Sequence, residues 1–106
     1  MNVDRLTIRT SESGWTLSGE IDAHTAPVLE GAVITLPSGT AAVSLDVRDV
    51  SFIDSSGLRV LIGLAERAGE AGRTLRVDHP SPAVARLVEI TGLGDMFGLA
   101  GSPTDV

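Results

Sequence analysis

The residues best suited to chemistry gather in one short stretch, residues 53–58, which reads I-D-S-S-G-L. Side chains such as Asp and Ser bind the free N–H groups at the start of a helix, so the stretch is typical of a helix N-terminus capped by Asp54 or Ser55. A phosphate on Ser55 is the chemical alternative. A helix N-terminus favours negative charge by about 0.3–1 kcal/mol at an exposed site, and the phosphate would add nearly two charges beside Asp54.

Nucleophilic catalysis is a second chemistry open to this serine. A serine hydroxyl is a weak nucleophile until a base activates it, and the chain has two histidines, His24 and His79. His24 follows Asp22 by two residues, so a Ser/His/Asp grouping is conceivable if that loop packs beside Ser55. The stretch lacks the glycine two positions before the serine that shapes a nucleophile elbow, which argues against a hydrolase. We expect His79 in a loop that ends the fourth strand.

Metal and nucleotide sites have weaker support. The carboxylates Asp46, Asp49 and Asp54 are close in sequence, but strand alternation puts only some on one face, and no glycine-centred calcium loop accompanies them. The glycines of residues 92–98 are spaced much like a dinucleotide loop, yet they follow a helix and their run is one residue too long. We therefore expect no metal and no cofactor, and interpret residues 92–98 as a helix terminator.

Two hydrophobic periodicities predict the elements that position these residues. Residues 5–9 and 15–21 alternate on either side of a Ser-Glu-Ser-Gly turn, which predicts a β-hairpin with Trp15 as a packing residue. Further alternation predicts a third strand over residues 43–49 and a fourth at 75–77. Between and after these strands the apolar residues recur at helical spacing.

Three helices are predicted. Thr25 is expected to cap the first, with a proline in the first turn. The clearest amphipathic helix begins around Ser56 and stops at Gly72, and the third begins at Ser81 and is closed by Gly92. Strands separated by such helices pair in parallel through right-handed crossovers. We therefore expect an α/β fold with a mixed sheet of four to five strands, an N-terminal antiparallel hairpin and helices packed on the sheet.

Composition is that of one folded domain and excludes several partners. The 106 residues carry a net charge of −6, and all eight basic residues are scattered arginines. Such a surface repels phosphate backbones and anionic lipid, so direct nucleic-acid binding and membrane insertion are not expected. The absence of cysteine excludes disulfides and thiolate chemistry. The first residues lack a signal-peptide pattern and no run approaches about 18 apolar residues, so a cytoplasmic location is expected.

Several motifs together resemble the STAS domain of bacterial anti-sigma factor antagonists. They are G-E-I-D at 19–22 with T-A-P at 25–27, V-S-L-D-V-R-D-V-S-F-I-D-S-S-G-L at 43–58, R-V-L-I-G-L at 59–64, P-S-P-A-V-A-R-L-V-E-I-T-G-L at 80–93 and D-M-F at 95–97. The resemblance implies a single STAS domain over residues 1–106 with a core of about 5–97. Residues 98–106 are expected to fray, and their composition does not support the fourth helix that many family members have.

The resemblance implies a reversible protein switch and no catalytic residue. In this family the unphosphorylated antagonist binds an anti-sigma factor that is also a serine kinase, and so frees a sigma factor for transcription. The kinase uses ATP to phosphorylate the serine directly after the aspartate of D-S-S-G, and a phosphatase of the PP2C type removes the group. On this chain the implied acceptor is Ser55.

The resemblance also implies a set of partner-binding residues, in which Asp22 belongs to a second contact loop and Gly57 permits close approach of the partner's backbone. The full set is Asp22, Asp54, Ser55, Ser56, Gly57 and Arg59. An alternative stays open, because I-D-S-S-G suits it equally. In that alternative the chain is an accessory subunit of a transporter or sensor complex, which binds proteins without a phosphate cycle.

Overall fold

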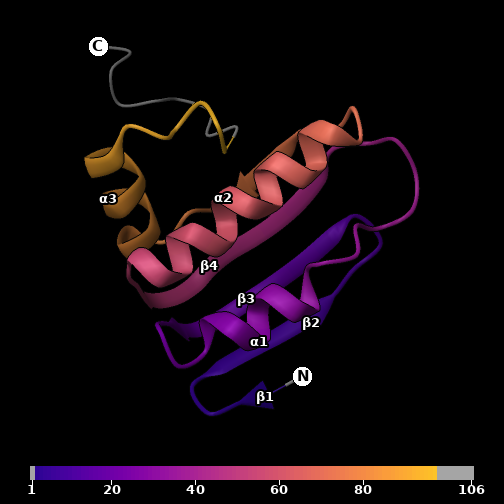
Figure 1. Ribbon diagram of the computed structural model, residues 1–106. Helices are drawn as coiled ribbons and strands as arrows, with labels where there is room; N and C mark the ends of the chain where they lie inside the picture. Colours follow the sequence, from indigo (N-terminus) through magenta and orange to yellow (C-terminus); the bar gives the residue numbers. More distant parts are fainter. Residues whose placement is uncertain (1, 98–106) are drawn as a thin grey trace.

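The computed structural model describes residues 2–97, which form one mixed β-sheet with helices packed on it (Figure 1). The strands are β1 (Asn2–Val3), β2 (Leu6–Thr10), β3 (Gly14–Ile21), β4 (Val43–Ile53) and β5 (Leu75–Asp78). The helices are α1 (Ala26–Ala32), α2 (Ser55–Glu70) and α3 (Pro82–Thr91). In space the strands follow chain order, antiparallel from β1 to β3 and parallel from β3 to β5. The predicted α/β fold is confirmed.

The strand order decides where the helices lie. The connections from β3 through α1 to β4, and from β4 through α2 to β5, each join neighbouring parallel strands and advance in the same direction across the sheet. Right-handed crossovers then place both helices on one face, where Figure 1 shows α1 and α2 next to each other. As a result, both helices begin at the same edge of the sheet, where β3 and β4 end.

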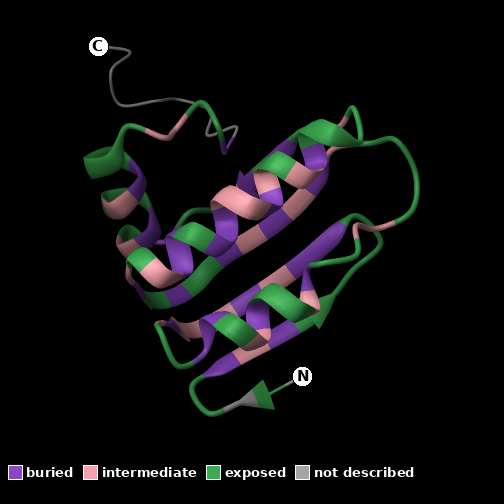
Figure 2. Cartoon of the chain, viewed as in Figure 1, coloured by how far each residue is buried: buried purple, intermediate pink, exposed green. Residues whose placement is uncertain are grey.

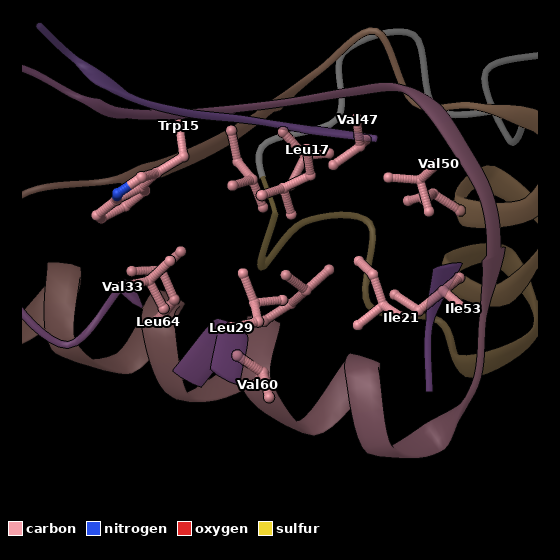
Figure 3. Packing of buried hydrophobic residues seen from close by; sticks show 14 of the residues in the cluster. Trp15, Leu17, Ile21, Leu29, Val33, Val47, Val50, Ile53, Val60 and Leu64 are labelled. Atoms are coloured by element: carbon pink, nitrogen blue, oxygen red, sulfur yellow. The ribbon is translucent and has the colours of Figure 1, made fainter. Parts of the chain in front are cut away.

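An aliphatic core fills the space between this face and the two helices. Leu17 of β3, Leu29 of α1 and Leu64 of α2 are completely buried, and Figure 3 shows them within one continuous cluster. Burying a side chain of this size contributes about 1.5–3 kcal/mol. Trp15 lies at one end of the cluster near Val33, as expected of a packing residue. Figure 2 shows that buried and exposed residues alternate along α2, as expected of an amphipathic helix.

Helix α3 covers the part of β4 that β5 leaves open. β5 pairs with residues 43–46 of β4 only, and α3 contacts β4. Ser81 caps α3 by accepting the N–H of Val84 at 3.3 Å, and Gly92 ends it with a left-handed φ of 73°, as predicted. Val84 and Val88 are buried. Among residues 2–97, none of the helices is both long and apolar enough for a bilayer crossing.

The segment after α3 returns to the sheet. The backbone carbonyl of Phe97 accepts the N–H of Val77 in β5 at 2.9 Å, and the Phe97 side chain is completely buried. Residues 92–97 therefore do more than terminate a helix, which was the predicted role, because they cover the edge of β5. The predictions for residues 98–106, that they fray and form no fourth helix, lie outside the described residues.

Two boundaries around residues 53–58 differ from the sequence prediction. β4 extends to Ile53 instead of ending near Asp49, because its last residue pairs with Ile21 at the end of β3. α2 begins at Ser55, one residue before the predicted start. Strand and helix are consequently separated by one residue, Asp54.

Phe97 provides a test of this edge packing. We expect Phe97→Ala to lower the free energy of unfolding by about 3–5 kcal/mol, because the substitution leaves a cavity in the core. Its neighbour Met96 is 39% exposed, so Met96→Ala is expected to cost less than about 1 kcal/mol. Urea unfolding of the two variants measures the difference, and equal losses would contradict the role given to Phe97.

Candidate functional site

Asp54 lies between β4 and α2 and forms hydrogen bonds with both the sheet and the helix. Its backbone N–H donates to the carbonyl of Ile21 at 3.1 Å, which continues the pairing of β4 with β3. Its Oδ1 accepts the N–H groups of Ser56 at 2.8 Å and Gly57 at 3.2 Å. The backbone is extended (φ −115°, ψ −170°), as is usual for an N-cap residue. Of the two candidate caps, Asp54 is therefore the one that the structure uses.

Ser55 is the first residue of α2 and is exposed. Within the described part of the chain its hydroxyl has no hydrogen-bond partner. The residue before it is held to both the sheet and the helix, so the backbone that carries this hydroxyl is well positioned. The arrangement offers an accessible oxygen on a rigid base, which suits a group that another protein must reach.

Gly57 lets α2 begin close to the sheet. A Cβ at this position would lie 2.6 Å from Cγ2 of Ile21 and 2.8 Å from Cγ1 of Ile53, and the residue is buried. Figure 3 shows these two isoleucines next to each other at the end of the core. The space left by its missing side chain is thus filled by residues of its own chain, and the predicted approach of a partner's backbone at Gly57 stays a prediction.

Asp22 organises the turn that follows β3. Its Oδ1 accepts the N–H groups of His24 at 2.9 Å and Thr25 at 3.0 Å, while Nη2 of Arg5 donates to its Oδ2 at 2.5 Å. The hydrogen bond from the Thr25 N–H, followed by the one from Arg5, lowers the pKa of Asp22 from 3.8 to about 2. Asp22 is therefore an ionised carboxylate whose oxygens already have partners.

Thr25 occupies the N-cap position of α1 without capping it. Its hydroxyl donates to the carbonyl of Glu20 at 3.0 Å and accepts the N–H of Asp22 at 2.9 Å, and the side chain is completely buried. The prediction of a capping hydroxyl is wrong. Thr25 instead ties the turn back to the end of β3, and this fixes the position of residues 22–25 next to α2.

A shallow depression of about 210 Å³ separates the first turns of the two helices. Ala23, Ala26, Pro27 and Glu30 line one side, and Ser56, Arg59 and Val60 line the other. The two segments predicted to contact a partner therefore face each other across this depression. Ala23, Pro27 and Glu30, which were not among the predicted partner-binding residues, are brought there by the parallel pairing of β3 with β4.

The Ser/His/Asp grouping does not form. His24 uses Nε2 to contact Oδ2 of Asp4, and Asp22 is paired with Arg5. His79 lies directly after β5, as predicted, in a left-handed conformation with a φ of 51°. Within residues 2–97, no three His, Cys, Asp or Glu side chains lie close enough together to hold a metal ion.

Comparison with known proteins supports the family resemblance that the sequence motifs indicate. Residues 5–99 match the family model of the Mlab STAS domain. The anti-sigma-B factor antagonist of Bacillus subtilis (strain 168) is 34% identical over 84 residues, which are 79% of this chain and 77% of that protein.

Solved structures show the same fold. An anti-sigma factor antagonist from Mycobacterium paratuberculosis is 29% identical, with a TM-score of 0.63 over 95% of this chain and 92% of that one. The anti-sigma factor antagonist SpoIIAA in its unphosphorylated form is 25% identical, with a TM-score of 0.61 over 86% of this chain and 84% of that one.

Substitution of Gly57 tests how closely α2 packs on the sheet. We expect Gly57→Ala to destabilise the protein by about 1–3 kcal/mol, because the added methyl overlaps two buried isoleucines. Gly69 in the same helix has open space around it, so Gly69→Ala is expected to stabilise by about 0.4–1 kcal/mol. Thermal unfolding distinguishes the two effects, and a stabilising Gly57→Ala would contradict the packing described.

The Asp22 turn predicts a specific pH dependence. Because the pKa of Asp22 is about 2 when folded and 3.8 ordinarily, its contribution to stability is complete above about pH 5 and is lost as pH falls through the folded pKa. We expect Asp22→Asn to be less stable than the parent at pH 7, with a difference that shrinks between pH 4 and pH 2. Urea unfolding across this range measures it, and a constant difference would refute the assignment.

A variant at Arg5 separates the two causes of this shift. Arg5→Gln is expected to raise the pKa of Asp22 toward 3.8 by removing one of its partners. Arg9 has no carboxylate partner among the described residues, so Arg9→Gln should leave this pKa unchanged. Carboxyl ¹³C NMR titration of both variants provides the measurement.

Proposed function

Since the chain belongs to the STAS domain family of anti-sigma factor antagonists, we propose that it binds an anti-sigma factor when unphosphorylated and so frees a sigma factor for transcription. The anti-sigma factor is a serine kinase, and phosphorylation of Ser55 ends the complex. The observation that carries the proposal is the exposed, unbonded hydroxyl of Ser55 at the junction of β4 and α2. A second support is that a solved relative, the anti-sigma factor antagonist SpoIIAA, is known in its unphosphorylated form.

The proposed modification needs no catalytic group from this chain. The Ser55 oxygen forms a bond to the γ-phosphorus of ATP as the bond from that phosphorus to ADP breaks, and the hydroxyl proton passes to a base on the kinase. His24, which the sequence suggested as a base for Ser55, contacts Asp4 instead. This agrees with a base supplied by the kinase. Hydrolysis by a PP2C-type phosphatase returns the hydroxyl and releases inorganic phosphate.

Charge and bulk explain why the phosphate would dissociate the complex. A phosphoserine carries about −1.5 to −2 charges at pH 7, here directly beside the Asp54 carboxylate on a chain of net charge −6. Asp54 cannot move away, because its Oδ1 holds two N–H groups of α2. A partner seated over the depression would therefore meet a new anion at a fixed position.

The remaining site residues divide into two groups in the proposed interface. Ser56 and Arg59 line the depression and offer direct contacts. Asp22 is 18% exposed and bound to Arg5, so it acts by holding the 22–25 turn and presenting Ala23. Gly57 acts by packing α2 against the sheet.

Binding measurements with the cognate anti-sigma kinase test this function. We expect Ser55→Ala to bind with an affinity within about twofold of the parent, and Ser55→Asp to bind at least about tenfold more weakly, equivalent to about 1.4 kcal/mol. Ser38 is exposed in the loop between α1 and β4, so Ser38→Ala and Ser38→Asp serve as matched controls that retain binding.

Two results would contradict the proposal. The first is equal affinity of Ser55→Ala and Ser55→Asp by calorimetry. The second is phosphate found elsewhere, or nowhere, when the protein is incubated with the kinase and ATP and its peptides are mapped. Copurification of a transporter subunit in place of an ATP-binding anti-sigma factor would support the accessory-subunit alternative instead.

A further inference from the structure

Arg59 is an unpaired cation one helical turn after Ser55. It is exposed on α2, and within residues 2–97 its guanidinium has neither an ion pair nor a hydrogen bond. Residues four apart on a helix lie on the same face with Cβ atoms about 5–6 Å apart. Helical side chains also lean toward the N-terminus. The long Arg59 side chain can therefore reach the turn that contains Ser55.

Several other donors near Ser55 already have acceptors. The N–H groups of Ser56 and Gly57 both donate to Oδ1 of Asp54. Arg5, in the neighbouring turn, donates to Glu20 at 2.7 Å and to Asp22 at 2.5 Å. Arg5 is therefore occupied, whereas Arg59 is still free to bind an anion.

The sequence of α2 provides no acidic partner for Arg59. The positions three and four residues away are 55, 56, 62 and 63, which are Ser, Ser, Ile and Gly. Glu30 lines the opposite wall of the depression but forms no ion pair with Arg59. A phosphate on Ser55 would create an anion four residues before a cation, which is the favourable orientation for such a pair.

We propose that phosphoserine at position 55 is bound by Arg59 of the same helix, whose planar guanidinium donates charge-assisted N–H bonds to the phosphate oxygens. The inference rests on the proposed function for the origin of the phosphate. Its consequence is a double change on the surface. Modification adds an anion at Ser55 and also withdraws the cation from the wall of the depression, so a partner loses an attractive group as it meets a repulsive one.

Phosphorus NMR of a homogeneous phosphoprotein tests the proposal without any kinase. Phosphoserine is installed at position 55 by genetic encoding in the parent, in Arg59→Gln and in Arg86→Gln. The second phosphate pKa is ordinarily about 6, and we expect it to be about 0.3 lower in the parent than in Arg59→Gln, as suits an exposed pair one turn apart. Gln has nearly the helix propensity of Arg, so α2 is preserved.

Arg86 is the matched control, because it is exposed on α3 and does not line the depression. Arg86→Gln is expected to have the parent's phosphate pKa, and Arg59→Lys to keep part of the lowering. A second readout is the Nε–H signal of Arg59, which should shift when position 55 carries phosphoserine and not when it carries Ser.

The outcomes separate this inference from the proposed function. A phosphate pKa that is the same in the parent and Arg59→Gln, with an unshifted Nε–H signal, overturns the Arg59 pair even if the kinase modifies Ser55. A lowered pKa and a shifted signal support the pair even if no kinase proves to modify Ser55. Equal changes in Arg86→Gln and Arg59→Gln also overturn it, because they would reflect overall charge.

Discussion

The hydrogen bonds by which Asp54 joins the sheet to α2 are the constraint on which the site depends. Its N–H extends the parallel pairing of β4 with β3, and its carboxylate caps α2. A cap of this kind is worth about 1 kcal/mol, but its geometric effect is larger. Because one residue hydrogen-bonds to both elements, the chain passes from strand to helix with only Asp54 between them. The backbone that carries the Ser55 hydroxyl is therefore held at a fixed place on the surface.

The polar groups around this junction serve two different purposes. Asp22, Thr25 and Arg5 have their hydrogen-bonding atoms engaged within the chain, and they hold the turn after β3 against the edge of the sheet. The side chains of Ser55 and Arg59 have no hydrogen-bond or ion-pair partner within residues 2–97 and are exposed. This division suits a binding surface that is modified by another protein. The bonded groups shape the depression, and the unbonded ones are available to respond to a phosphate.

Local patterns in the sequence predicted most of the architecture. The hairpin alternation, the cap at Ser81 and the stops at Gly72 and Gly92 all occur as expected, because each depends on residues a few positions apart. The motif at residues 53–58 is likewise recognisable as a helix start that carries two serine hydroxyls. Its family resemblance agrees with the comparisons with known relatives.

Tertiary structure decided what depends on distant contacts. The last residues of β4 belong to the sheet because Ile21 lies opposite Ile53, and Gly57 is needed because both isoleucines occupy the space of its Cβ. Thr25 bonds the end of β3 in place of its own helix, and Phe97 is buried at the edge of β5. Sequence by itself determined which segments form helices and strands and that a pair of serines stands at the start of a helix. Only the fold determined what each side chain faces, because those neighbours come from other elements of the chain.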